Sequence, residues 1–369
     1  MKVVMLSPFF PLHGGGVEVV AGQLARRLGS SGCQVDWFAS GGRNEIPDES
    51  DGVSVHAAQA MDFTEKRFGL PWPVWGIRTL RNLYAAIGRA DMVHAHDYIY
   101  MPTVMAYVFC RMRRKPFFIT QHIGRIEYKS NLARRILSFL NRTLGRFLLR
   151  SAHEVFFVSP VVREYFSEIA GRPIGMFLPN GVDHDVYWFA KKTDRDRVLR
   201  VVFVGRFVEK KGVGLLNECL DIPGLSWVFL GQGPLQPNEG PAARVMHGLR
   251  GDDVVPWYHW ADVLVLPSKG EGFPLVVQEA LSCGTPVLIS EEVGAAFATK
   301  DSRCVFTVDL ETDQAVDLLR QALTALRDDV IPLRESGQIA RELSMQWSWE
   351  RVVTTCRDAY VRTIERGGN

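Results

Sequence analysis

The chain has 369 residues, which is long enough for two domains of ordinary size. Its 47% hydrophobic and 23% charged residues are typical of a soluble globular protein and exclude a disordered or fibrous chain. The net charge of +2 conceals an asymmetry: residues 111–150 hold 11 Lys or Arg against Glu127 alone, a charge of +10, whereas the remaining 32 basic and 40 acidic residues give −8.

The chain shows no sign of export or of membrane insertion. Six scattered cysteines lack CxxC or metal-type spacing, which favours a reduced, cytoplasmic setting. No run of 18 apolar residues occurs, and the nearest, residues 98–110, is interrupted by Pro102. The opening MKVVMLSPFFP is typical of a first strand rather than of a secretory signal.

Strands and helices alternate along the first half. The helix signal is clearest over residues 17–28, where apolar residues recur at helical spacing up to Gly29. Further helices are predicted near residues 75–89, 101–113 and 130–150. Strands are predicted at Val3–Leu6, Gln34–Ala39, Val53–Ala57, Asp91–His94, Pro116–Thr120 and Glu154–Val158. This alternation predicts an α/β fold with a doubly wound parallel sheet.

A turn-rich and polar segment then separates two halves. The sequence LPNGVD ends at Asp183 and KKTDRDR follows, so we predict domains over residues 1–183 and 184–346 and a closing helix over 347–369. The second half repeats the alternation, with strands at Arg200–Val204, Trp227–Leu230, Val263–Leu266 and Pro286–Ile289. Two Rossmann-like domains should face across a cleft at the carboxyl ends of their strands.

Two strand-to-helix turns have features of phosphate sites. Gly14, Gly15 and Gly16 allow close backbone approach in front of a helix N-terminus, although such a turn can also be merely tight. In the second half, the loop GRFVEKKG carries Arg206 and Lys211. These side chains could converge on a diphosphate, or they could simply belong to a solvated basic loop.

Two carboxylates follow the strand at Val263–Leu266. Glu271 falls in the loop EGFP, and Glu279 falls about two turns into the next helix. One acid near a phosphate or sugar and a second near a ribose would form a nucleotide-sugar site. Together with Arg206 and Lys211, the pair favours this functional interpretation.

Other polar residues carry weaker signals. His122 follows the strand PFFIT at the end expected to face the cleft, whereas we interpret His94 and His96 as structural. The acidic triplets at residues 183–185 and 194–196 lie away from the predicted strand ends, so we predict no metal site.

The predicted helix at residues 130–150 is amphipathic. Its apolar side comprises Leu132, Ile136, Leu140, Leu144, Phe147 and Leu148, and we expect that side to pack on the core. Its basic side comprises Arg134, Arg135, Arg142 and Arg146. Four arginines without an acid among them indicate a surface for anionic lipid or for a lipid-diphosphate acceptor.

These motifs resemble those of one enzyme family. GRFVEKKG, LGQGP, ADVLVLPSKGEGFPLVVQEALSCGTPVL, PNGVD and WSWERVV are similar to segments of the retaining glycosyltransferases of family 4, of the type that builds bacterial surface polysaccharides. The resemblance implies the GT-B fold, with the last helix crossing back to the first domain. It also implies sugar transfer from a nucleotide-sugar without a metal or another cofactor.

The resemblance also assigns roles to individual residues. Arg206 and Lys211 would hold the donor diphosphate, Glu279 would bind the ribose hydroxyls, and His122 would lie near the donor sugar. Glu271 would meet the donor sugar and phosphate together with the backbone of Gly272, Phe273, Pro274 and Leu275. Gly15 and Gly16 would border the diphosphate and the acceptor.

One segment departs from the family pattern. Between GQGP and ADVLVLPS the chain is short, and the usual segment before that strand is reduced to about RVMHGL (244–249). In such enzymes this region helps to form the nucleotide-base pocket. This shortening puts the identity of the donor in doubt.

The expected function is therefore transfer of a sugar to a lipid-linked saccharide in the synthesis of a surface polysaccharide such as lipopolysaccharide. The expected location is the cytoplasm, peripherally on the inner face of the cytoplasmic membrane, with no nucleic-acid partner. The alternatives are a GT-B nucleotide-sugar epimerase, a transferase to a small soluble acceptor, and a decayed sugar- or lipid-binding module.

Overall fold

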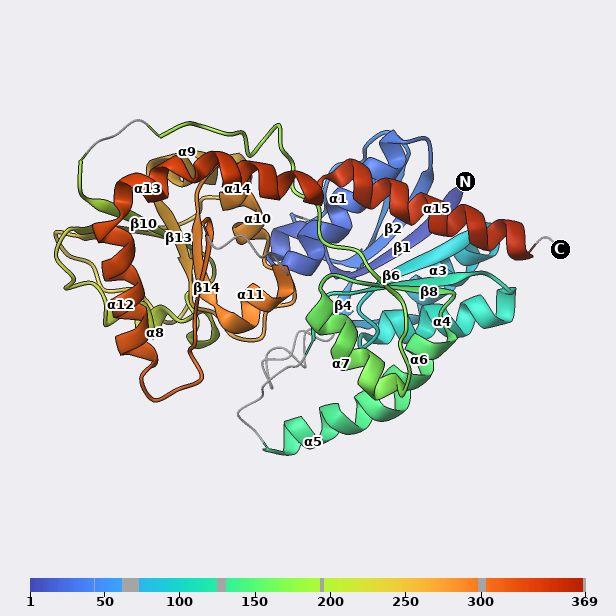
Figure 1. The fold of residues 1–369 in the computed structure, drawn as a ribbon. Helices are drawn as coiled ribbons and strands as arrows, with labels where there is room; N and C mark the ends of the chain where they lie inside the picture. The colour runs from blue at the N-terminus through green and yellow to red at the C-terminus, as the bar shows by residue number, and fades with distance from the viewer. Residues whose placement is uncertain (43, 62–72, 125–130, 193–195, 298–302, 368–369) are drawn as a thin grey trace. The chain divides into compact units, whose positions relative to one another are not determined.

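The computed structural model describes residues 1–42, 44–61, 73–124, 131–192, 196–297 and 303–367, which divide into two compact units (Figure 1). The first unit comprises Met1–Gly181 and Trp349–Asn369, and the second comprises Val182–Ser348. The chain thus leaves the first unit once and returns to it with its last helix, α15 (Trp349–Gly367). The sequence placed these divisions after residues 183 and 346.

The first unit is built on a parallel sheet with the strand order β3-β2-β1-β6-β7-β8-β9. Its strands are β1 (Lys2–Phe9), β2 (Gln34–Ser40), β3 (Val53–Ala58), β6 (Met92–His96), β7 (Phe117–Gln121), β8 (Glu154–Phe157) and β9 (Met176–Phe177). A separate antiparallel pair joins β4 (Ala60–Met61) to β5 (Val74–Trp75). The six predicted strands are all present, whereas β9 is too short to produce a sequence pattern.

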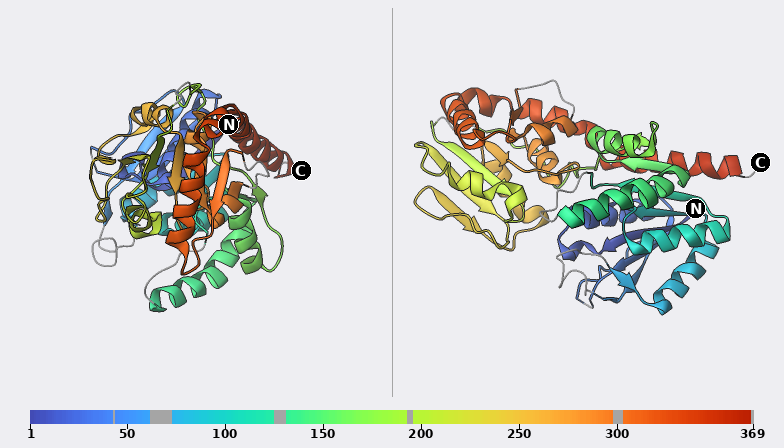
Figure 2. Two further views of the ribbon diagram at one scale, coloured as in Figure 1. Left: turned by 60° about the vertical axis from the view of Figure 1, so that its left-hand side comes forward. Right: turned by 90° about the horizontal axis from the view of Figure 1, so that it is seen from below.

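Helices cover both faces of this sheet (Figure 2). They are α1 (Gly16–Ser30), α3 (Ile77–Arg89), α4 (Met101–Arg113), α5 (Asn131–Leu140), α6 (Arg146–Ser151) and α7 (Pro160–Ala170), with the short 3-10 turn η1 (Pro11–His13) before α1. Strands β1, β6 and β7 are buried along almost their whole length, because helices exclude water from both sides of a doubly wound sheet.

Helix α1 buries the predicted apolar stripe, but Gly29 does not end it. A Cβ at Gly29 would lie 2.5 Å from the carbonyl oxygen of Asp51, so the glycine allows the helix to pack closely against the turn before β3. The helix α15 also packs on α1. The guanidinium of Arg27 lies over the ring of Trp349, and Arg357 donates a hydrogen bond to the carbonyl of Ser31.

The predicted helix at 130–150 is interrupted, and its buried side differs from the expected one. A π-helical segment, η2 (Asn141–Gly145), separates α5 from α6. Gly145 packs against the ring of Tyr98, and Asn141 accepts a hydrogen bond from the Tyr98 hydroxyl. Leu148 is buried as expected, but Leu137, Leu149, Asn141 and Gly145 form the rest of the buried side. The predicted apolar side was therefore wrong in part, and Ile136 and Phe147 are 51% and 56% exposed.

The second unit repeats the architecture, with the strand order β12-β11-β10-β13-β14-β15. Its strands are β10 (Leu199–Val204), β11 (Leu225–Leu230), β12 (Ala243–Met246), β13 (Val263–Leu266), β14 (Val287–Ser290) and β15 (Val305–Val308). Its helices are η3 (Glu209–Lys211), α8 (Val213–Asn217), η4 (Gly251–Val254), α9 (Val255–Trp260), α10 (Leu275–Ser282), α11 (Glu291–Phe297), α12 (Ala315–Asp328), α13 (Val330–Glu335), α14 (Gly337–Ser344) and η5 (Met345–Trp347).

Strands β12 and β15 were not predicted. The shortened segment noted in the sequence, residues 244–249, begins within β12, and residues 231–242, which are all described, connect β11 to β12 without a helix. None of the helices in the described residues is both long and apolar enough to span a bilayer.

Candidate active site

Two loops of the second unit bring Lys211 and Glu271 together. The loop after β10 ends at Gly212, whose φ of 76° is left-handed and whose Cβ would lie 2.3 Å from the carbonyl oxygen of Pro267 after β13. The backbone N–H of Lys269 donates to the carbonyl of Lys210 across the same junction, at 2.8 Å. This close approach, which a glycine allows, places the Lys211 Nζ 2.9 Å from the Glu271 Oε1.

The charge around Glu271 is predominantly positive. Burial acts to raise the pKa of Glu271, but Lys211, Lys210 and Arg206 together bring it below its ordinary value, so the carboxylate is ionised at neutral pH. Arg206 is exposed, and within the described part of the chain it forms no ion pair. Three cations therefore surround one carboxylate, an excess that suits a ligand with two or more negative charges. Lys210 was not singled out from the sequence.

The loop that carries Glu271 is fixed at both ends. The backbone N–H of Gly270 donates to the carboxylate of Glu292, at 3.0 and 3.1 Å from its two oxygens. Phe273 is buried and stacks on Phe297 with ring centroids 4.3 Å apart. Helix α10 begins at Leu275, two residues beyond Phe273. In its first turn Val277 donates to the carbonyl of Pro274, whereas the N–H groups of Leu275 and Val276 have no acceptor within the helix and can donate to an anion.

Glu279 lies one turn further along α10 and is held by tyrosines. The hydroxyl of Tyr258 donates to its Oε2 at 2.8 Å, and Tyr187 also hydrogen-bonds to this carboxylate. Burial raises the pKa of Glu279, and both tyrosines oppose that shift. The two tyrosines fix the orientation of the carboxylate. They were missed because neither belongs to a motif.

In the first unit, the glycine turn leads directly into α1. Gly14 has a φ of 92°, and Gly15 is the N-cap residue of the helix. A Cβ at Gly15 would lie only 1.9 Å from an oxygen of Glu18, because this buried side chain folds back over the first turn, whereas the Cβ position of Gly16 is open. The carboxylate of Glu18 therefore lies next to Gly15, at a position where the sequence predicted a phosphate.

His122 belongs to a buried histidine pair. Its Nε2 lies 2.8 Å from the Nδ1 of His96, and the two rings are stacked. Sequence reasoning treated His96 as structural and did not connect it with His122. His94, by contrast, hydrogen-bonds to Thr120 and to the Tyr360 hydroxyl on α15, an arrangement that anchors the last helix.

Asp97 supports this pair from the end of β6. It has a φ of 60°, and its Oδ1 accepts the backbone N–H groups of His122 and Ile123 at 2.8 and 3.3 Å. Burial raises the pKa of Asp97 to about 7. Burial lowers the pKa of His96 to about 3 and that of His122 well below its ordinary value, so both rings are neutral. The signal for Asp97 was its position after VHAH at the end of a strand.

The remaining sequence-predicted residues lie elsewhere. The Oδ1 of Asp183 accepts the backbone N–H groups of Asp185 and Val186, and Asp196 pairs with Arg334 and Arg200; Asp194 lies outside the described residues. Within the described ranges, no group of three His, Cys, Asp or Glu side chains could hold a metal ion. The four predicted surface arginines, Arg134, Arg135, Arg142 and Arg146, are all exposed, whereas Arg125, Glu127 and Lys129 of the basic segment lie outside the described residues.

The two parallel sheets share the order of their first six strands, and in the second unit a cationic loop at a strand end lies beside a helix N-terminus. Two Rossmann-like units with such a loop are the architecture of the GT-B fold, and the comparisons identify the class as glycosyltransferase. The model of Glycosyltransferase Family 4 matches residues 14–186, and that of Glycosyl transferases group 1 matches residues 199–329. The D-inositol 3-phosphate glycosyltransferase of Arthrobacter sp. (strain FB24) is 32% identical over 395 residues, which cover 95% of this chain and 91% of the relative. The chain therefore belongs to glycosyltransferase family 4.

Solved structures share the fold over the whole chain. Sucrose-phosphate synthase from Thermosynechococcus elongatus matches with a TM-score of 0.80 and 19% identity, over 99% of this chain and 100% of that one. HepE of Anabaena, solved in complex with UDP-glucose, matches with a TM-score of 0.70 and 16% identity, over 99% of this chain and 100% of that one. The GT-B fold and membership of glycosyltransferase family 4 are confirmed, and the surface-polysaccharide type stays a prediction.

Proposed function

We propose that this glycosyltransferase transfers a sugar from a nucleoside-diphosphate sugar, with retention of anomeric configuration and without a metal, to a lipid-linked saccharide during synthesis of a cell-surface polysaccharide. The observation that carries the donor half of this proposal is the cluster of Arg206, Lys210 and Lys211 around Glu271, next to the N-terminus of α10. HepE of Anabaena, which has the same fold, was solved with UDP-glucose bound.

The cluster suits a diphosphate leaving group. Negative charge grows on the diphosphate as its bond to the sugar breaks, and Arg206 and Lys211 would stabilise that charge in the way that a metal ion does in other transferases. Arg206 offers a planar fork to two phosphate oxygens, and Lys211 offers a compact charge whose position Glu271 fixes.

The other residues would position the sugar and the nucleoside. Glu279, oriented by Tyr258 and Tyr187, would accept hydrogen bonds from the ribose hydroxyls. His122, which is neutral, would hydrogen-bond to the donor sugar. The acceptor hydroxyl would attack from the face that the diphosphate leaves, and a phosphate oxygen would take its proton, so that configuration at the anomeric carbon is retained.

The acceptor half of the proposal rests on the surface of α5, η2 and α6. The four exposed arginines Arg134, Arg135, Arg142 and Arg146 lie on the same segment as the exposed apolar side chains Ile136, Phe139 and Phe147. Cationic side chains next to exposed apolar ones are typical of helices that lie in a membrane interface. This surface supports peripheral association with the inner face of the cytoplasmic membrane, where lipid-linked acceptors are found.

The donor is tested with a panel of nucleotide-sugars. The correct donor should raise the thermal midpoint, because a ligand that binds only the folded state stabilises it. Arg206→Ala and Lys211→Ala should each lower turnover by about two orders of magnitude or more, with the fold intact. Near-wild-type turnover in both variants would contradict the assignment. Release of nucleoside diphosphate without any glycosylated product would instead indicate an epimerase.

A small soluble acceptor is the second candidate, because the name of the relative from Arthrobacter specifies D-inositol 3-phosphate. Transfer of a radiolabelled sugar distinguishes the two acceptors, since the product partitions into butanol when the acceptor is a lipid and stays in water when it is not. Label that is found only in the aqueous product would exclude the lipid-linked acceptor. Donor binding with no transfer to any acceptor would indicate a decayed binding module.

A further inference from the structure

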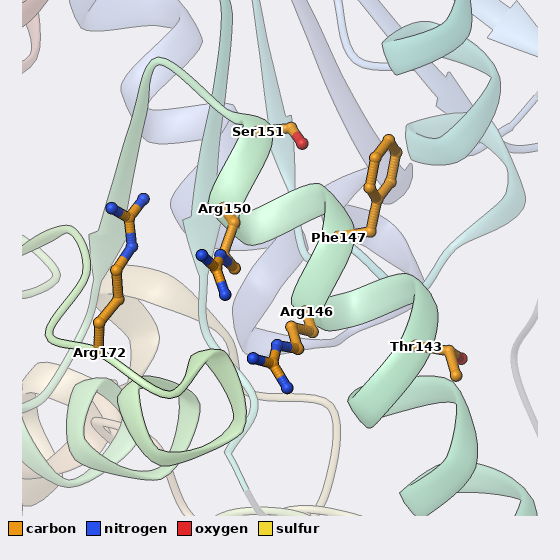
Figure 3. Close-up of a pocket in the computed structure, with 6 residues that line it drawn as sticks. All are labelled: Thr143, Arg146, Phe147, Arg150, Ser151 and Arg172. Carbon is orange, nitrogen blue, oxygen red and sulfur yellow. The ribbon is translucent and has the colours of Figure 1, made fainter.

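Figure 3 shows an arginine-lined pocket of about 460 Å³ on the first unit. Its lining residues are Thr143, Arg146, Phe147, Arg150, Ser151 and Arg172. Arg150 and Ser151 end α6 just before β8 begins, and Arg172 lies between α7 and β9. These residues therefore precede strands, whereas His122 and Asp97 follow strands, and the two groups lie at opposite edges of a parallel sheet.

The guanidinium groups of Arg146 and Arg150 lie at the C-terminal end of α7, and Arg172 follows that end in the chain. Arg150 donates from its Nη1 to the carbonyl of Ala170 at 3.2 Å. The Nη2 of Arg146 lies 3.4 Å from the position that a Cβ on Gly171 would take, and Arg172 is the next residue. Figure 3 shows the ends of all three arginines on one side of α6, with Thr143 and Phe147 pointing to its other side.

The end of α7 by itself does not account for three cations. Its carbonyl groups carry a partial negative charge that attracts one cation, and Arg150 supplies it. The nearest acids along α7 are Glu164 and Glu168, both exposed, and in the described part of the chain neither forms an ion pair with Arg146 or Arg172. All three arginines are exposed, so solvent screens part of their mutual repulsion, and an anion bound between them would remove the rest.

A phosphate group fits this pocket best. The guanidinium fork matches two oxygens of a phosphate, and three such groups line this one pocket. We propose that Arg146, Arg150 and Arg172 form a binding site for a phosphomonoester or phosphodiester group, separate from the donor site. The phosphate belongs either to an anionic lipid head group or to a small soluble molecule, and the site does not depend on sugar transfer.

The test measures phosphate binding by the full chain without any nucleotide-sugar. One arm titrates inorganic phosphate and glycerol 3-phosphate by calorimetry. The other arm measures co-sedimentation with vesicles of phosphatidylglycerol and phosphatidylcholine in equal parts. The pocket variant is Arg146→Gln/Arg150→Gln/Arg172→Gln. Its matched control, Arg78→Gln/Arg81→Gln/Arg89→Gln, removes the same charge from exposed positions of α3. Equal thermal midpoints without phosphate show that both variants fold.

The pocket variant should lose at least about tenfold in affinity, and the α3 control should stay near wild type. A loss in both arms identifies a free phosphate as a sufficient ligand, and a loss with vesicles alone identifies the lipid head group.

The proposal is wrong if the wild type binds in neither arm, or if the pocket variant loses no more than the control. It is also wrong if Arg146→Lys/Arg150→Lys/Arg172→Lys binds as tightly as wild type, because charge alone would then explain binding. Since neither arm uses a donor, failure here leaves the donor half of the proposed function untouched.

Discussion

The Nζ of Lys211 lies 2.9 Å from the Oε1 of Glu271, and this ion pair joins the loops that follow β10 and β13. Both side chains are only 14% exposed. A pair so poorly hydrated is costly to break from one side, since the remaining charge loses its partner and stays out of water.

Lys211→Met should therefore destabilise the protein by about 1–3 kcal/mol. This is less than the cost of breaking a fully buried ion pair from one side, because Lys210 and Arg206 also interact with Glu271. The double variant Lys211→Met/Glu271→Gln should recover most of this loss, because the buried charge is removed together with its partner. Urea unfolding of the two single variants and the double variant gives the coupling energy. Strictly additive effects would mean that the ion pair does not hold the loops together.

Gly212 makes this ion pair possible, and its replacement should be severe. Gly212→Ala places a Cβ 2.3 Å from a backbone oxygen of Pro267 at a φ of 76°, so the two loops must separate. We expect a loss of about 2–4 kcal/mol and weaker donor binding. Gly214→Ala is the control: this glycine lies in α8 with open space at its Cβ position, and alanine there should stabilise by about 0.4–1 kcal/mol. Chemical denaturation that finds the two variants equally stable would contradict the role of Gly212.

The sequence was sufficient for the architecture because the alternation of apolar strands with amphipathic helices is regular. It failed where tertiary packing overrides the pattern. Asn141 and Gly145 belong to the buried side of the segment at 131–151 together with Leu137, Leu148 and Leu149, and neither Asn141 nor Gly145 appears in an apolar periodicity. The strand β12 was missed because ARVM offers only four residues at the edge of its sheet.

Only part of the candidate site was predictable from the sequence, because only some of its residues stand in motifs. Arg206, Lys211, Glu271 and Glu279 stand in motifs, so the sequence marked them. Lys210 adds charge through space, and Asp97 contacts His122 only because β6 and β7 are neighbours in the sheet. Such relationships come from the fold, so a single sequence shows them only once the strand order is known.

The buried histidines should make stability fall at acidic pH. Burial holds the pKa of His96 at about 3 and the pKa values of His94 and His122 well below 6.5. Below pH 6.5 the unfolded chain takes up protons that the folded chain does not, so the stabilisation is complete above pH 6.5 and is lost as the pH falls toward 3. Each histidine contributes a slope of up to about 1.4 kcal/mol per pH unit.

His94→Gln tests this with His96 and His122 themselves unchanged, although it removes the ring that stacks on His96. Glutamine can keep polar contacts with Thr120 and Tyr360 but does not titrate. The slope of unfolding free energy against pH, between pH 5 and about 6.5, should therefore decrease by the contribution of roughly one bound proton. Urea unfolding at several pH values measures the slope. An unchanged slope would mean that His94 is already protonated in the folded state.

Asp97 should respond to pH in the opposite direction. Its folded pKa of about 7 lies above the ordinary 3.8, so the folded chain keeps a proton that the unfolded chain releases. Its contribution is therefore most favourable below pH 3.8 and is lost as the pH rises through 7.

Asp97→Asn keeps the acceptor for the N–H groups of His122 and Ile123 and tolerates the φ of 60°, and it removes the buried charge. The variant should be more stable than wild type at pH 8, by about 1–4 kcal/mol, and should gain much less at pH 5. Thermal and urea unfolding at both pH values measure the difference, with Asp97→Ala as the control that loses the acceptor. An equal effect of Asp97→Asn at pH 5 and pH 8 would show that the carboxyl does not titrate in this range, and that packing rather than charge determines its contribution.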